Sequence, residues 1–289
     1  MKVRIKGAVS VTAVVALSVV AGAFGSSRVS AQQPPAAGAQ QGGRGQGRGG
    51  AQAGAPPSAR ANAPIDLTGY WVSIVNEDWR WRMITAPRGD FPGLPLSPAG
   101  REVAMAWDPK TDGSCKAFGA AGLMRMPTRV RLSWTDDTTL KIETDNGLQT
   151  RLLHFDARSP RAESRGRRPG PPSLQGDSAA EWERTLSPNN PFGINFPGGP
   201  PPPPGGSLRV VTTNLTGGWL RRNGVPYSAR ATVTEHFDRF PGPDGSEWFV
   251  VTTQVIDPEY LLGRLVTSSH FRREPDASKW SPKACKPGP

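Results

Sequence analysis

The sequence contains few of the residues that most often carry chemistry. Only two cysteines and three histidines occur in 289 residues. Two cysteines without a CxxC pair or nearby histidines cannot form a zinc ribbon. The chain also lacks the G-x-S-x-G nucleophile elbow, the H-E-x-x-H zinc motif, the P-loop and a dinucleotide-binding glycine fingerprint between a strand and a helix. These absences leave no positive evidence for a hydrolase, a nucleotide-binding enzyme or a structural zinc site.

Long apolar runs are also missing beyond the N-terminus. Three basic residues within the first six positions precede an uncharged, mostly apolar stretch, Gly7–Phe24. Val29-Ser30-Ala31 then supplies small residues at the two specificity positions of a cleavage site. This pattern predicts a secretory signal peptide over residues 1–31, cleaved after Ala31, and a periplasmic or secreted mature protein. An uncleaved anchor is the alternative, since the stretch is at the lower limit of a bilayer span.

The net charge of +11 does not indicate a nucleic-acid partner. The basic surplus lies in residues 1–31, 32–64 and 156–176, and what remains for the rest of the chain is close to neutral. Residues 32–64 consist mainly of Gln, Gly, Ala, Pro and Arg with no large apolar residue, which predicts a disordered, flexible tether. We therefore expect no nucleic-acid binding and no further membrane span.

The two cysteines, Cys115 and Cys285, are expected to form one disulfide in an oxidising compartment. Such a bond would tie the Pro- and Lys-rich C-terminal tail to the folded body. The alternative is two unpaired thiols.

Strand-like patterns begin after residue 64. All nine Trp and all three Tyr lie beyond this point, in short β-branched and aromatic runs that alternate with period two. Turns are expected at Asp136-Asp137, at Asn146-Gly147 and at Pro243-Asp244-Gly245. The segments expected to be strands are 68–75, 79–85, 128–134, 139–145, 148–155, 178–186, 207–213, 229–237, 247–256 and 264–272.

Only one helix is expected, with Ser97 as its N-cap, Pro98 at its first position and an end at Asp108-Pro109. Two long Pro- and Gly-rich insertions, 156–176 and 187–206, interrupt the strands. We therefore predict a single all-β domain over residues 65–289, an antiparallel up-and-down barrel of about 8–10 strands. Closure into a barrel removes exposed sheet edges.

The first expected strand reads Leu67-Thr68-Gly69-Tyr70-Trp71 and resembles the Gly-x-Trp opening of the calycin barrels, the lipocalins and avidins. This resemblance implies that Trp71 lies at the closed end of a barrel and that a basic residue of the last strand, Arg272 or Arg273, packs over it. The chain departs from lipocalins because its helix lies between early strands and no C-terminal helix follows.

Five further segments carry a longer resemblance: Asp78–Met83, Cys115–Gly122, Asn223–Tyr227, Thr234–Phe237 and Asp257–Leu261. Over nearly all of residues 65–272, the chain resembles a group of exported bacterial proteins with no assigned activity. This resemblance implies export and the barrel fold, and it implies no chemistry.

Strand parity separates inward from outward polar residues. Each of the three histidines, His154, His236 and His270, precedes a Phe, so inward Phe rings direct the histidines outward, and no metal site is expected. Arg151 and Glu235 share a face with inward apolar residues, where a charge needs a partner. They could form a buried pair, which Asp78 or Arg82 could join, or they could hold the polar end of a ligand.

Trp79, Trp81 and Met83 alternate with Arg80 and Arg82, which predicts a strand with one aromatic face. That face is either a wall of a ligand cavity or an aromatic layer of the core. Trp134 and Trp248 also fall at strand positions that could face inward.

These patterns favour a barrel that binds a small, largely apolar molecule without a cofactor. Trp71, Trp79, Trp81, Trp134 and Trp248 would line or close the cavity, with Arg151 and Glu235 as polar contacts. One alternative is an isomerase or hydrolase on the same barrel that uses His154 or His236 with Glu235. Another is a structural or interaction protein of the cell envelope, tethered through residues 32–64 and docking through residues 187–206, with a partner that the sequence does not identify.

Overall fold

The computed structural model describes residues 58–112, 115–155, 170–184 and 205–285. The predicted signal peptide 1–31, most of the 32–64 tether and the larger part of both insertions lie outside these residues. The chain divides into two units, of which residues 1–53 are wholly outside the described ranges. The fold below is that of the second unit.

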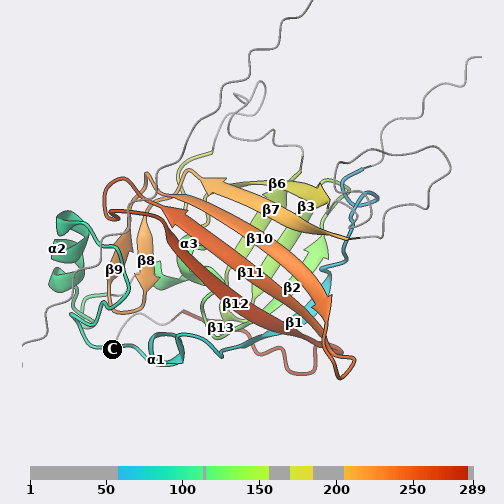
Figure 1. Ribbon diagram of the computed structural model, residues 1–289, viewed down its shortest axis with the longest axis horizontal. Coiled ribbons are helices and arrows are strands. Elements are labelled where there is room, and N and C mark those ends of the chain that lie inside the picture. Colours follow the sequence, from blue (N-terminus) through green and yellow to red (C-terminus); the bar gives the residue numbers. More distant parts are fainter. Residues whose placement is uncertain (1–57, 113–114, 156–169, 185–204, 286–289) are drawn as a thin grey trace, which may run out of the picture. The chain divides into compact units, whose positions relative to one another are not determined.

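Nine strands of the described chain close into a barrel (Figure 1). Each strand pairs with the next barrel strand along the chain, and the last pairs with the first. All nine coincide with segments whose period-two alternation predicted a strand, so the all-β barrel is confirmed. The strands are β1 (Gly69–Ile74), β2 (Arg129–Trp134), β3 (Thr139–Thr144), β5 (Thr150–His154), β6 (Asp177–Arg184), β7 (Gly206–Thr213), β10 (Thr232–Pro241), β11 (Glu247–Ile256) and β12 (Leu265–Glu274).

The prediction of a purely antiparallel barrel was wrong at one place. β5 and β6 run parallel, with Leu153 opposite Ser178 and His154 opposite Ala179. An odd number of strands cannot alternate in direction all the way round a closed barrel, so one neighbouring pair has to be parallel. Parallel neighbours need a long crossover connection, and residues 155–176, which include the predicted first insertion, provide its length.

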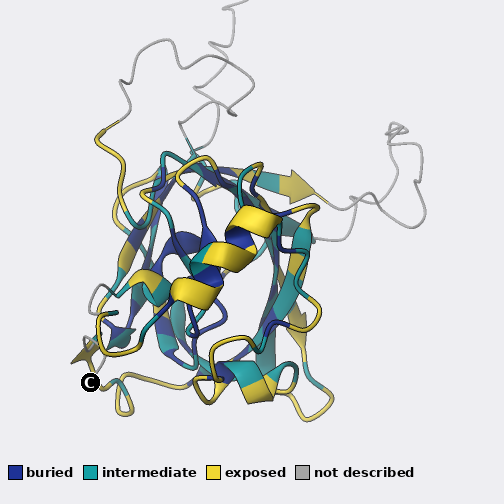
Figure 2. Ribbon diagram, turned by 90° about the vertical axis from the view of Figure 1, so that its left-hand side faces the viewer, coloured by how far each residue is buried: buried dark blue, intermediate teal, exposed yellow. Residues whose placement is uncertain are grey.

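One end of the barrel is covered by the remaining elements, and α2 lies across that opening (Figure 2). Only α2 was expected; the described chain has three short helices and one 3-10 turn instead of a single helix. These elements are α1 (Trp79–Arg82), α2 (Pro98–Ala106), the 3-10 turn η1 (Lys116–Phe118), α3 (Ala120–Leu123) and the hairpin β8 (Gly218–Arg221) with β9 (Val225–Tyr227).

α2 has the expected start. The Ser97 hydroxyl accepts a hydrogen bond from the Gly100 amide at 3.0 Å, and Pro98 occupies the first turn. The same hydroxyl donates to the Glu259 carbonyl at 2.8 Å, which joins the helix start to the β11–β12 connection. Ala104 is fully buried on the face of α2 directed at the barrel end.

Two apolar clusters form the core. The first fills the barrel at the end where β1 begins and is rich in aromatic rings, including Trp71, Phe237, Phe249 and Phe271. The ring centroids of Phe249 and Phe271 are 4.7 Å apart, because the two residues are opposite each other in the β11–β12 register. The second cluster lies at the covered end and joins the barrel to α2, α3, β8 and β9.

The predicted disulfide is confirmed. Cys115 and Cys285 are bonded, with their Cα atoms 5.7 Å apart. Beside the bond, the short strand β13 (Lys283–Ala284) pairs in parallel with β4 (Asn146–Gly147), the expected Asn-Gly turn. The C-terminal segment is therefore fixed to the body by a covalent bond and by backbone pairing.

Residues 58–64, the last part of the predicted tether, contact the barrel. The Trp182 indole donates to the Ala59 carbonyl at 2.8 Å, and the Arg60 amide donates to the Asp137 carbonyl at 3.1 Å. The chain thus meets the barrel before the first strand begins.

Candidate functional site

Trp71 lies beneath a cation from the last strand, as the calycin resemblance implies. Its side chain is completely buried, and its indole donates to the Leu67 carbonyl at 3.0 Å. The Arg273 guanidinium carbon lies 5.5 Å from the centre of the Trp71 ring, within the range of a cation–π contact. Arg272 instead contacts Trp248 at 6.0 Å. Trp71 is therefore part of the barrel core.

The Arg273 guanidinium is fixed by Glu247, which accepts a hydrogen bond from Arg273 Nη1 at 2.5 Å and another from Arg239. The hydrogen bond from Arg273, together with that from Arg239, holds the pKa of the Glu247 carboxyl below its usual value. This carboxylate links β11 to β10 and β12 at the Trp71 end.

The buried Arg151–Glu235 pair is confirmed. Arg151 Nη2 lies 2.7 Å from Glu235 Oε2, Nη1 lies 3.2 Å from Oε1, and both side chains have zero exposed surface. The hydroxyl of Thr212 accepts from Arg151 at 3.1 Å and lies 2.8 Å from the hydroxyl of Ser178. Asp78 and Arg82 do not join the pair. A cavity that held even one water would leave exposed surface on its lining side chains, so no ligand space adjoins these two.

The histidines face outward, as parity predicted. His236 and His270 keep about a third of their side-chain surface exposed, and both following Phe rings, Phe237 and Phe271, are fully buried. His154 is partly buried and lies 3.3 Å from the Thr139 hydroxyl. None of the three is hydrogen-bonded to the Glu235 carboxylate, which is occupied by Arg151. The His–Glu arrangement required by the enzyme alternative is therefore not formed.

The strand expected over residues 79–85 was wrong. Asp78 has a left-handed backbone, φ 53°, and its carbonyl accepts from the amides of Trp81 and Arg82, so the chain turns into α1. Arg82 then anchors the turn: its side chain is 1% exposed and donates to the Arg125 carbonyl, to Glu77 and to Ser73. The alternating sequence cannot indicate this long-range anchor.

Because residues 79–82 are helical, the two tryptophans do not form one aromatic face. Trp79 is 62% exposed, whereas Trp81 is partly buried. The guanidinium of Arg221, from β8, lies over the Trp81 ring at 4.5 Å, and that of Arg80 at 5.4 Å.

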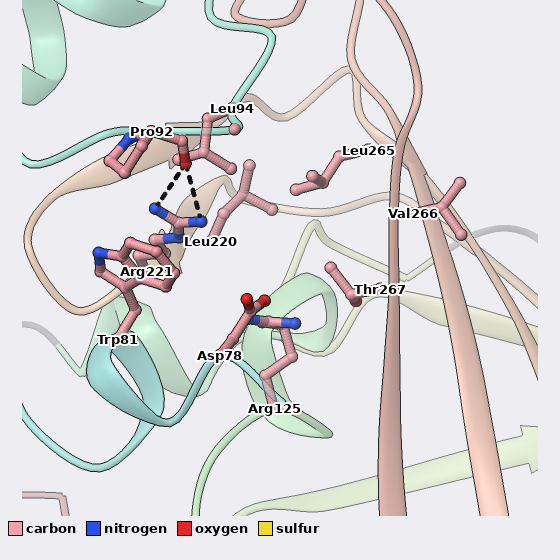
Figure 3. Close-up of a pocket in the computed structure, with 11 residues that line it drawn as sticks. Asp78, Trp81, Pro92, Leu94, Arg125, Leu220, Arg221, Leu265, Val266 and Thr267 are labelled. Atoms are coloured by element: carbon pink, nitrogen blue, oxygen red, sulfur yellow. Dashed lines mark hydrogen bonds and ion pairs between the residues drawn. The ribbon is translucent and has the colours of Figure 1, made fainter. Parts of the chain in front are cut away.

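A cavity of about 300 Å³ opens beside Trp81 (Figure 3). It lies between α1, the loop at residues 92–94, β8 and the start of β12. Its apolar lining includes Leu94, Leu220 and Leu265. Its charged lining is formed by Asp78, Arg125 and Arg221. We refer to this cavity as the Trp81 cleft.

The charged lining of the Trp81 cleft contains a nearly buried arginine. Arg125 has a side chain that is 9% exposed, and its Nη2 donates to Asp78 at 2.8 Å. Its Nη1 has no hydrogen-bond partner among the described residues. Arg221 donates from both terminal nitrogens to the Pro92 carbonyl, each at 3.3 Å.

Positive charge exceeds negative charge around the cleft. Burial lowers the pKa of Arg221, and the nearby Arg125 cation lowers it further. Burial also lowers the pKa of Arg222, which donates to the Arg82 carbonyl at 2.7 Å. Within the described chain no carboxylate forms an ion pair with Arg221 or Arg222. The remaining arginines here are paired: Arg80 with Asp90, Arg82 with Glu77 and Arg125 with Asp78.

The predicted ligand residues are not brought together. Trp134 packs against Phe155 at the Trp71 end, with ring centroids 5.4 Å apart. Trp248 donates to the Ser246 hydroxyl at 2.6 Å beside Arg272. Of the predicted set, which comprised Trp71, Trp79, Trp81, Trp134, Trp248, Arg151 and Glu235, only Trp81 lines the cleft.

Sequence reasoning missed Arg125 and Arg221 as site residues. Arg125 is the one charge among the buried Leu123, Met124 and Met126, and a cation in such an apolar run was an available signal. Arg221 lies in a hairpin strand too short to show a period.

Comparisons of this chain with protein-family models, with curated proteins and with solved structures give no match. No helix among the described residues has the length and apolar character needed to cross a membrane. Functional inference therefore depends on the fold and on the Trp81 cleft.

Proposed function

We propose that this is an exported protein that binds a small, largely apolar molecule in the Trp81 cleft. The observation that carries the proposal is the cavity itself, with its apolar wall, its aromatic ring and its few converging polar groups. Ligand sites are usually concave, mostly apolar and provided with a small number of polar groups that orient the ligand. The cavity volume of about 300 Å³ is at the lower end of the usual range for such sites, which favours a small ligand.

The barrel interior is a poor ligand site by comparison. Trp71, Phe237 and Glu235 have no exposed surface, so the interior around them is filled by the protein's own side chains. The proposed site differs in this respect from a ligand held inside a barrel. Export is supported by the predicted signal and by the disulfide, which is typical of proteins in oxidising compartments.

The test is calorimetric titration of the mature protein with decanol and with decanoate. Leu265 lines the cleft from β12, and Leu265→Trp would fill part of the cavity. We expect this variant to weaken binding of either probe by about tenfold or more, because lost apolar contact and overlap both oppose entry. Leu152→Trp is the matched control, since Leu152 is 43% exposed on β5 and lies away from the cleft. Absence of binding by both probes, or equal binding in the two variants, would contradict the proposal.

A further inference from the structure

The charged lining of the Trp81 cleft has more cationic hydrogen-bonding capacity than the protein itself uses. Arg125 is more than nine-tenths buried, and its Nη1 has no partner in the described chain, although buried guanidinium groups are normally fully hydrogen-bonded. Leaving such a donor unpaired costs free energy. Figure 3 shows the Arg125 guanidinium beside Asp78, on the side of the cleft opposite β12.

Arg221 adds a second cation to the lining of the cleft. It is held over Trp81 by stacking and by the Pro92 carbonyl, and neither contact supplies a negative charge. A positive charge removed from water requires a nearby anion for compensation. The carboxylates that raise the pKa of Arg221, Asp78 and Asp90, form ion pairs with other arginines, Arg125 and Arg80.

The apolar lining of the cleft would not accept a free inorganic anion well. The Arg221 guanidinium lies beside Pro92, Leu94 and Leu220, and Arg125 lies beside Asp78, so cationic and apolar groups line the same cavity (Figure 3). A ligand that matches both kinds of group has one anionic group and a short apolar body.

We propose that the Trp81 cleft selects amphiphilic carboxylates of the fatty-acid type, with the carboxylate bound by Arg221 and Arg125. This inference rests on the proposed function and names the ligand class for the same site. The planar guanidinium group suits the two oxygens of a carboxylate. Asp78 uses only Nη2 of Arg125, so the buried Nη1 can donate to a bound carboxylate once the side chain shifts toward the cleft.

Asp78 limits the affinity in this arrangement. Its carboxylate is 38% exposed, lies at the cleft and repels an incoming anion. Replacing it by Asn keeps the backbone, since Asn tolerates the left-handed conformation that Asp78 adopts, φ 53°. The variant therefore changes the charge at the cleft with little change in the turn.

The test compares two probes on the wild-type protein. Decanoate carries a charged carboxylate, whereas decanol carries a neutral hydroxyl in its place. We expect decanoate to bind about tenfold more tightly or better, as for a hydrogen bond to a charged group. Arg221→Met should weaken decanoate binding about tenfold and decanol binding by a much smaller factor. Asp78→Asn should act in the opposite direction and strengthen decanoate binding alone.

The matched control for Arg221→Met is Arg272→Met, which removes an arginine that contacts Trp248 away from the cleft. It should change neither affinity. If wild-type protein binds decanol as tightly as decanoate and Asp78→Asn changes neither, the selection for carboxylates is wrong while the binding function stands. If neither probe binds, the proposed function itself fails.

Discussion

Arg151 and Glu235 form a completely buried ion pair in the barrel. The contribution of the pair to the free energy of folding depends on both partners being present. The attraction between two buried charges is offset by the cost of removing each from water. While both partners are present, the pair therefore adds little net free energy to the folded state. Replacing both residues should therefore change the free energy of unfolding much less than replacing one of them.

We predict that Arg151→Met alone lowers the free energy of unfolding by about 3–5 kcal/mol, because it leaves Glu235 buried without a cation. The double variant Arg151→Met/Glu235→Leu should recover most of this loss, since Ser178 and Thr212 still hydrogen-bond each other. Urea unfolding monitored by circular dichroism measures both. Arg209→Met, in the more exposed pair with Glu181, is the control and should change stability by less than about 1 kcal/mol. Equal losses in the single and double variants would show that the charge imbalance is unimportant.

Glu247 should make part of the stability dependent on acid. Because hydrogen bonds from Arg273 and Arg239 lower its pKa in the folded state, its contribution is complete above the unfolded pKa of about 4.3 and is lost as the pH falls through the folded value. We predict that Glu247→Gln is less stable than wild type near pH 7, and that the difference shrinks toward about pH 3. Paired urea titrations at the two pH values measure it. A difference that stayed constant would exclude Glu247 as a source of acid sensitivity.

At the scale of elements, helix α2 is fixed to the β11–β12 connection by close backbone contact. A Cβ atom added at Gly100 would lie 2.4 Å from the Tyr260 carbonyl oxygen, which is backbone and cannot rotate away. Helix propensity alone predicts that Gly100→Ala stabilises by about 1 kcal/mol. We predict the opposite sign, a loss of about 1–2 kcal/mol, because overpacking exceeds the propensity gain.

Thermal unfolding of the Gly100→Ala variant, measured in parallel with Glu102→Ala as a control, tests this prediction. Glu102 is exposed on the same helix, and its substitution should change stability by no more than about 0.5 kcal/mol. A stabilised Gly100→Ala protein would show that α2 can shift away from the connection.

Elements with one buried face were predictable from the sequence. Period-two alternation located the nine barrel strands, and parity placed Arg151 and Glu235 inside and the histidines outside. The same rule failed at residues 79–83, where polar and apolar residues alternate but the conformation is set by the Asp78 turn and by the hydrogen bond from Arg82 to the distant Arg125 carbonyl. The Trp81 cleft was unpredictable for the same reason, since it combines short segments that show no period.

At the scale of the whole molecule, one local error changed the predicted topology. Ten strands can alternate in direction around a closed barrel, and nine cannot. Once residues 79–82 are helical, the strand count among the described residues becomes odd and a parallel pair is required. The length of the 156–176 insertion could be read from the sequence. Its role as the crossover between two parallel strands follows only from the odd number of barrel strands.

The parallel β5–β6 pair also determines where this chain could be rearranged. β12 and β1 are antiparallel neighbours, and the end of β12 lies beside the start of β1, with Glu274 opposite Tyr70. A circular permutant could therefore join the two ends of the described chain through a linker and begin at β6. In that permutant every consecutive pair of barrel strands would be antiparallel, and the parallel contact would fall between the first and last strands. The long crossover would no longer be needed to form the barrel.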